Sequence, residues 1–162
     1  DFDCNSWPEA PLVAADGTAY LMDFPTIYAF DAALRRLPGW PVEVPGYLAS
    51  PVAPGFEGLD CGWGMEPVAG PNGTLYLSLE PTSKARGGRL DAIAKTGKRP
   101  TGWPVGLNRA GSTFWDVAVG DDGTVYALVV EPEGKKKKKA SATLVAIDPD
   151  SEVRYAVTLL EP

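Results

Sequence analysis

A single sequence pattern occurs three times in this chain, and it decides which folds are available to it. Each copy opens on a short apolar run that leads into Asp-Gly-Thr or Asn-Gly-Thr, with a tyrosine two residues after the threonine. These tripeptides lie at residues 16–18, 72–74 and 122–124, and the tyrosines are Tyr20, Tyr76 and Tyr126. A unit that recurs at long, similar intervals is typical of solenoids and propellers, in which each unit packs against its neighbours.

Two further blocks follow in each copy. The first is apolar and lies at residues 27–31, 90–94 and 144–148. The second reads Gly-Trp-Pro-Val at residues 39–42 and 102–105, whereas the third copy reads Tyr-Ala-Val at residues 155–157. The repeated Trp-Pro pair therefore belongs to a structural unit and is not an isolated motif.

We expect four short strands in each copy, an interpretation favoured by the 18 glycines and 16 prolines spread along the chain. The Asp-Gly and Asn-Gly pairs predict hairpin turns of type I′. The fourth strand should start at the tryptophan and lie at a sheet edge, because Pro41 and Pro104 have no N–H for a strand ladder. The third strands are apolar at consecutive positions, which predicts that both faces of each sheet are covered.

The predicted fold is all-β: a partial β-propeller of three four-stranded antiparallel blades. Blade 1 is expected at about 7–44, blade 2 at about 63–107 and blade 3 at about 115–160, with an inter-blade loop at 45–66 in one unit of residues 1–162. Propellers typically have about 4–8 blades, so three blades cannot close a ring. We therefore expect either two chains pairing into a six-bladed ring or completion by blades of another chain, because open ends would expose apolar faces.

The segment LDAIAKTGKRPTGWPV at residues 90–105 resembles the repeat of the PQQ-like (quinoprotein dehydrogenase-like) β-propellers. Those repeats typically read Leu-x-Ala-Leu-Asp-x-x-Thr-Gly-x-x-x-Trp. Two extra residues precede the tryptophan here, Ala94 replaces the aspartate, and the matching residues are Leu90, Ala92, Thr96, Gly97 and Trp103. The resemblance implies that Trp40 and Trp103 dock neighbouring blades. The family includes cofactor-dependent dehydrogenases and cofactor-free scaffolds, so the resemblance leaves the activity open.

Composition closes off several function classes. The chain has no histidine, which removes Ser-His-Asp and Cys-His catalysis and the commonest transition-metal ligand. Two cysteines are too few for a structural zinc site. A net charge of −6 disfavours nucleic acid as a partner, and no apolar run approaches the length of a membrane span. We accordingly predict no catalytic residue, no metal site and no cofactor.

Three tryptophans and two cysteines are the candidate site residues. Trp7, Trp63 and Trp115 each precede one of the three turns, so they could stack on a sugar or cofactor ring, but a recurring aromatic is more typical of packing between blades. Cys4 and Cys61 hold nearly equivalent places in two copies, and both a disulfide between them and two free thiols stay open. A disulfide would indicate an extracytoplasmic location, either periplasmic or secreted.

The leading interpretation is a non-enzymatic scaffold or binding module that assembles with itself or with a larger complex. Its expected partner is a second copy or another propeller-completing subunit, with no nucleic acid and no membrane span. One alternative is a fragment or subunit of a quinone-cofactor dehydrogenase, which would use an aspartate base and calcium. The other is a carbohydrate-binding propeller that uses Trp7, Trp63 and Trp115.

Overall fold

The computed structural model describes residues 11–23, 25–46, 66–79, 86–131 and 141–160, and every element in these ranges is a β-strand. The strands form three four-stranded antiparallel sheets, and each sheet is a meander in which consecutive strands are neighbours. The prediction of an all-β chain with three four-stranded antiparallel units is confirmed.

Each sheet contains one copy of the sequence pattern. Sheet A consists of β1 (Leu12–Val13), β2 (Ala19–Asp23), β3 (Thr26–Phe30) and β4 (Val42–Glu43). Sheet B consists of β5 (Val68–Ala69), β6 (Leu75–Leu79), β7 (Arg89–Ile93) and β8 (Val105–Gly106). Sheet C has longer strands, namely β9 (Thr113–Val119), β10 (Val125–Glu131), β11 (Ser141–Ile147) and β12 (Val153–Leu160).

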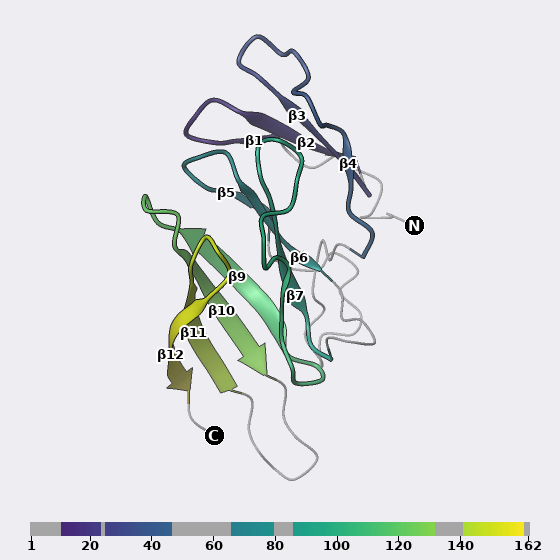
Figure 1. The fold of residues 1–162 in the computed structure, drawn as a ribbon. Coiled ribbons are helices and arrows are strands. Elements are labelled where there is room, and N and C mark those ends of the chain that lie inside the picture. The colour runs from purple at the N-terminus through teal and green to yellow at the C-terminus, as the bar shows by residue number, and fades with distance from the viewer. Residues whose placement is uncertain (1–10, 24, 47–65, 80–85, 132–140, 161–162) are drawn as a thin grey trace.

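The three sheets follow one another in space in chain order, with sheet A at the top of Figure 1, sheet B in the middle and sheet C at the bottom. Neighbouring sheets meet through their first strands, because β1 contacts β5 and β5 contacts β9. The arrangement is open, so sheets A and C each have one face that no described sheet covers.

The hairpin turns differ from the predicted type I′, which requires positive φ at two consecutive residues. In the first turn of sheet A, the N–H of Gly17 donates to the carbonyl of Ala14, and positive φ occurs only at Gly17, at 81°. This is a three-residue loop, a type I turn followed by a left-handed residue. The reason lies in Asp16, whose Oδ1 accepts a hydrogen bond from the N–H of Thr18 at 3.0 Å and so stabilises the right-handed conformation before the glycine.

The same loop recurs in all three sheets, both between the first and second strands and between the third and fourth strands. We call these loops the first turn and the third turn of a sheet. The first turns are residues 14–18, 70–74 and 120–124, and the third turns are residues 31–35, 94–98 and 148–152. In the third turns the left-handed residue is Leu34 in sheet A, Gly97 in sheet B and Ser151 in sheet C.

The fourth strands lie at the sheet edges, as the two prolines predict. In sheets A and B the ladder begins at Val42 and Val105, two residues later than expected. The Trp40–Pro41 and Trp103–Pro104 peptide bonds are cis, and the prolines have no N–H to pair, so the Trp-Pro segment stays outside the ladder.

Alternation along the strands gives each sheet two faces. We call the face turned toward the next sheet in the chain the forward face, and the face turned toward the preceding sheet the rear face. One hydrophobic core joins the forward face of sheet A, including Tyr20, Met22 and Ile27, to the rear face of sheet B, including Leu75 and Leu77. A second core joins the forward face of sheet B to the rear face of sheet C; its main members are Tyr76, Leu90, Ala92, Val125, Ala127 and Ile147.

Burial on the third strands follows this layering. The prediction of coverage on both faces is met in sheet B, where Leu90, Asp91, Ala92 and Ile93 of β7 are all buried. In sheet C it is wrong, since β11 is only partly buried from Ser141 to Val145. The partly buried residues of β11 lie on both faces, whereas Ala146 on the forward face and Ile147 on the rear face are fully buried.

Candidate interaction surface

One tryptophan joins sheet A to sheet B. The indole N–H of Trp40 donates a hydrogen bond to the carbonyl oxygen of Lys95, in the third turn of sheet B, at 2.8 Å. The same ring lies against the ring of Tyr20, with centroids 5.4 Å apart and planes tilted by 60°. Both side chains are buried. Packing and a directional hydrogen bond therefore act together in one side chain, as the apolar body and polar edge of tryptophan allow.

Two polar contacts support this junction. The hydroxyl of Tyr20 donates to the carbonyl oxygen of Gly73, in the first turn of sheet B, and burial with Asp16 nearby raises the pKa of Tyr20 to about 12. The hydroxyl therefore stays protonated and remains a donor. Lys95 Nζ lies 2.8 Å from Asp16 Oδ2. Burial acts to raise the pKa of Asp16, but the hydrogen bonds from Lys95 and Thr18 outweigh it, so that pKa lies below its ordinary value.

Glycines allow the two backbones to approach closely at the same place. A Cβ atom at Gly39 would lie 2.2 Å from the carbonyl oxygen of Thr96, and one at Gly97 would lie 2.4 Å from the carbonyl oxygen of Gly39. Both glycines have positive φ. The side-chain direction at position 97 therefore points toward the preceding sheet, and only glycine fits on both sides of this contact.

The junction between sheets B and C repeats the same plan. The indole N–H of Trp103 donates to the carbonyl oxygen of Pro149, in the third turn of sheet C, at 2.9 Å. Its ring lies edge-on to Tyr76, with centroids 5.5 Å apart. Here Ser151 replaces the glycine of the third turn, and a Cβ atom at Gly102 would lie only 1.9 Å from Ser151 Oγ. The Gly-Trp segment is thus a sheet-to-sheet connector, in agreement with what the family resemblance implies for Trp40 and Trp103.

A buried ion pair lies beside the first junction. The carboxylate of Asp91 on β7 is fully buried, and its Oδ2 lies 2.7 Å from Nε of Arg99, whose side chain is 41% exposed. Asp91 Oδ1 also accepts a hydrogen bond from the N–H of Ala92 at 3.0 Å. Burial raises the pKa of Asp91, and Arg99 offsets this only in part. The sequence analysis missed this pair, because the equivalent positions in the other sheets are Tyr28 and Val145.

The forward face of sheet C has the composition of a buried face, but of its apolar residues only Ala146 is fully buried. In register, its residues Tyr126, Leu128, Leu144, Ala146 and Val157 match Tyr76, Ser78, Leu90, Ala92 and Val105 of sheet B. Leu90 is fully buried, whereas Leu144 is partly exposed and Val157 is 52% exposed. Val157 is therefore more exposed than Val42 and Val105, its equivalents in the two existing junctions, which are partly buried.

The rear face of sheet A is the opposite open end of the stack. Its residues Ala19, Leu21 and Phe30 occupy the register positions that the rear-face residues of sheets B and C use to cover the preceding sheet, and all three are partly exposed. Val13, at the position of Val119 in sheet C, is 64% exposed. Leu34, in the third turn of sheet A, is the most exposed of the large apolar residues described, at 77%.

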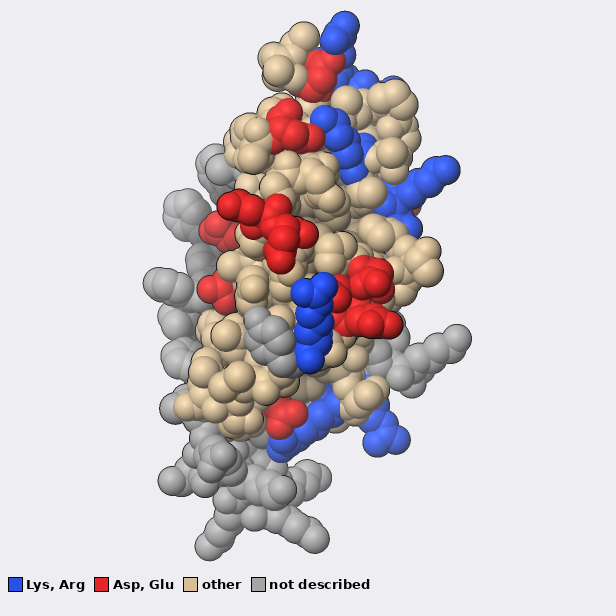
Figure 2. Space-filling model, turned by 60° about the vertical axis from the view of Figure 1, so that its left-hand side comes forward, with Lys and Arg blue, Asp and Glu red and all other residues tan. Residues whose placement is uncertain are grey.

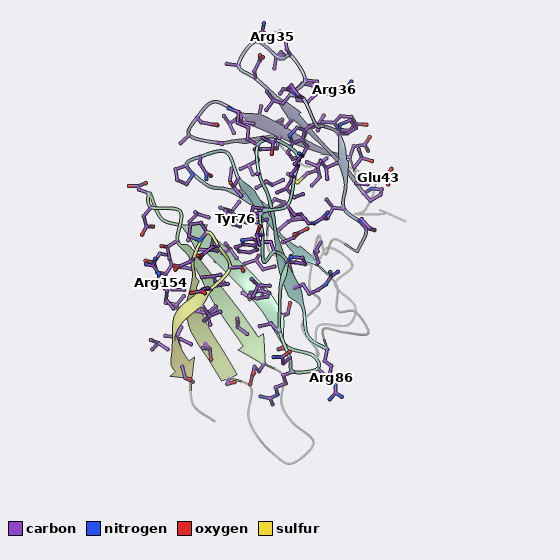
Figure 3. The ribbon with its side chains drawn as sticks, in the orientation of Figure 1. Arg35, Arg36, Glu43, Tyr76, Arg86 and Arg154 are labelled. Atoms are coloured by element: carbon purple, nitrogen blue, oxygen red, sulfur yellow. The ribbon has the colours of Figure 1, made fainter. Side chains whose placement is uncertain are left out.

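Charged side chains of both signs lie along the stack on the side that Figure 2 shows. Figure 2 shows acidic and basic side chains intermixed along one side of the molecule, with uncharged surface between them. Figure 3 shows Tyr76 inside the stack, while Arg35 and Arg36 lie at the end farthest from sheet C. Arg35 pairs with Asp31 within the third turn of sheet A, and Arg154 pairs with Asp148 beside the third turn of sheet C.

The predicted site residues fall mostly outside the described part of the chain. Trp7, Trp63, Cys4 and Cys61 lie outside the described residues, so stacking by the three tryptophans and the disulfide stay predictions. Trp115 lies on β9, at the bulge where the register with β10 shifts, and it is partly buried. Within the described ranges, no three cysteine or carboxylate side chains are grouped so that they could hold a metal ion.

Comparison of the sequence with protein families and with curated proteins gives no match. Among the described elements there is no helix with the length and apolar character needed to cross a bilayer.

Proposed function

We propose that this chain is a non-enzymatic scaffold, part of a β-propeller of the quinoprotein dehydrogenase-like kind, that assembles with itself or with a larger complex through its end sheets. The single observation that carries the proposal is the forward face of sheet C. It repeats the register of faces that pack on a neighbouring sheet elsewhere in the molecule, yet Val157 at its edge is 52% exposed where Val42 and Val105 are partly buried. A soluble protein gains about 25 cal/mol for each Å² of such apolar surface that it buries.

The packing of the three sheets supports the propeller interpretation. Meander sheets that stack in chain order, with their first strands in contact, are what blades around a common axis require. Tryptophan connectors that bind the following sheet give each unit a donor side and an acceptor side. An extracytoplasmic location belongs to the same proposal, and thiol quantification on denatured, unreduced protein tests the Cys4–Cys61 bond on which it rests.

Sedimentation velocity over a wide range of protein concentration tests the scaffold proposal. We expect the wild-type chain to associate, and Val157→Glu to abolish association, because it places a carboxylate on the face to be covered. The matched control is Val153→Glu, on the same strand and at nearly the same exposure, 53%, but paired with the rear-face residue Ile147. A stable wild-type monomer at every concentration contradicts the proposal, as does equal loss of association in both variants.

A further inference from the structure

The two open ends of the molecule differ in a way that makes them complementary. We infer that the forward face of sheet C binds the rear face of sheet A in a second copy of this chain, so that two chains close a ring of six sheets through two identical junctions. This inference rests on the proposed function, because it names the partner and the orientation of the same assembly.

The first argument is the direction of the existing junctions. In both junctions a forward face packs on the rear face of the next sheet, and the tryptophan connector of the forward side donates a hydrogen bond to a turn carbonyl of that next sheet. In the first junction the hydroxyl of Tyr20 also donates to such a carbonyl. Sheet C lacks that connector, but its forward face keeps the register of the two forward faces that pack on rear faces. The same pairing therefore assigns it a rear face, and the only uncovered rear face among the described sheets belongs to sheet A.

The second argument is the match of apolar positions. Across the junction between sheets B and C, Cγ1 of Val119 lies 3.4 Å from the place that a Cβ atom would take at Gly70. Val13 has the register position of Val119 on sheet A, and Gly120 has the position of Gly70 on sheet C. Placing sheet A on sheet C thus brings an exposed valine over a glycine, as in the junction already formed.

The third argument is a size match at the third turn. Gly97 and Ser151 are small because their side-chain positions face the Gly-Trp segment of the preceding sheet. Leu34, at the same turn position in sheet A, is large, has a positive φ of 58° and is 77% exposed. Sheet C lacks the Gly-Trp segment, since β12 begins at Val153, directly after the third turn. In the inferred dimer, Leu34 is the one large residue at this turn position, and it faces sheet C, the one described sheet without a Gly-Trp segment.

The head-to-tail orientation closes the assembly. A contact between unlike surfaces generates either a closed ring or an open chain, and with three sheets in each copy two copies give six sheets, within the range of closed propellers. Because both junctions of such a dimer are identical, a single change on either surface damages both of them at once. This property separates the arrangement from a face-to-face dimer, in which only one kind of surface is used.

Two charge variants test the orientation by native mass spectrometry and light scattering. Val157→Glu changes the forward end, and Leu34→Lys changes the rear end at a highly exposed position. We expect each variant alone to be monomeric where the wild type is dimeric, with a dissociation constant raised by about a hundredfold or more. An equimolar mixture should recover the dimer mass as a one-to-one heterodimer, because one junction is then unaltered and the other pairs glutamate with lysine.

Leu34→Gly keeps the test independent of folding. Glycine adopts positive φ without strain, so this variant should match or exceed the wild type in monomer stability and still lose the dimer. A dimeric wild type with a monomeric Val157→Glu variant and a fully dimeric Leu34→Lys variant would overturn the head-to-tail inference while leaving the scaffold function in place. A mixture that stays monomeric would also overturn it. A wild type that is monomeric at all concentrations would remove the inference and the proposed function together.

Discussion

Trp40 and Trp103 are the residues on which the packing of this molecule depends most directly. Each is buried against a tyrosine of its own sheet and donates its indole N–H to a turn carbonyl of the next. Leaving a buried carbonyl without its donor costs about 1–3 kcal/mol, in addition to the loss of packing. The preceding glycine is as necessary as the tryptophan, since it lets the indole reach the neighbouring turn.

Asp91 makes the stability of the folded protein depend on pH, and the direction of its pKa shift fixes the direction of that dependence. Burial raises its pKa above the ordinary value of 3.8, so the folded state binds a proton more tightly than the unfolded state. Its contribution to stability is therefore complete below about 3.8 and is lost as the pH rises through the raised value, by about 1.4 kcal/mol for each unit of the shift. We expect the stability of the wild type relative to Asp91→Asn to fall between acidic and neutral pH, as measured by urea unfolding.

Asp31 provides the matched control for this measurement. Hydrogen bonds from the backbone and side chain of Arg35 lower the pKa of Asp31, so its contribution is present at neutral pH and is lost on acidification. Asp31→Asn should therefore show a pH trend opposite to that of Asp91→Asn. A difference between wild type and Asp91→Asn that is constant, or that grows with pH, would contradict the role assigned to burial.

Within each sheet, the two three-residue turns have separate tasks. The first turn closes the hairpin, and in sheets B and C the third turn accepts the connector of the preceding sheet. Because the third turn contacts the connector, the glycine that precedes each tryptophan must fit against a turn that is distant in the sequence. The constraint is a close approach of two backbones, at Gly39 and Gly97 in the first junction.

Gly39→Ala and Gly17→Ala separate this close approach from ordinary backbone strain. Both glycines have positive φ, at 87° and 81°, so alanine is strained at either position. At Gly17, no described atom lies within 4 Å of the new Cβ, whereas at Gly39 the new Cβ would meet Thr96 O. We expect Gly39→Ala to lower the unfolding free energy by on the order of 2 kcal/mol more than Gly17→Ala in urea denaturation. Equal losses in the two variants would show that the junction tolerates the added methyl group.

The sequence predicts the strands and turns well because each of them occurs in three copies of the repeat that can be compared. The turns, the second strands and the edge position of the fourth strands all follow from residues such as Gly17, Tyr20 and Pro41. The turn type was wrong because the side chain of Asp16 caps the N–H of Thr18, which a dipeptide preference does not register. The position of Trp40 between sheets was implied by the family resemblance, but its acceptor at Lys95 could not be predicted without the packing of one sheet on another.

The candidate interaction surface could be predicted from the sequence only in part. An open stack with two apolar ends follows from three copies of the pattern, and the structure adds which residues lie on each face. Leu34 was missed, although alignment of the third turns places it opposite Gly97 and Ser151 and marks it as the odd member. The buried pair of Asp91 and Arg99 had no signal at all, since neighbouring copies have apolar or aromatic residues where Asp91 stands.

For the molecule as a whole, the layering predicts a gradient of local stability. Sheet B is covered on both faces, whereas sheets A and C each have one open face. In dilute solution we expect backbone amides of β7 to exchange with deuterium more slowly than those of β3 and β11, which occupy the same place in their sheets. Hydrogen-exchange mass spectrometry resolves these strands.

The same measurement at high concentration shows whether the ends become covered. Association through the end faces should slow exchange in β3 and β11 and leave β7 unchanged. Exchange in β11 that is already as slow as in β7 in the dilute protein would contradict the layered stability described above.

The connector between sheets restrains their relative orientation as well as their contact, because its indole is anchored at a turn carbonyl of the next sheet. In the proposed dimer the two connectors of each chain would set the angle between successive sheets, and a small change of that angle, repeated at every junction, would prevent the ring from closing. The same surfaces would then propagate into a helical filament. In the proposed dimer, the size of Leu34 would therefore help to set whether the assembly closes into a ring or extends into a fibre.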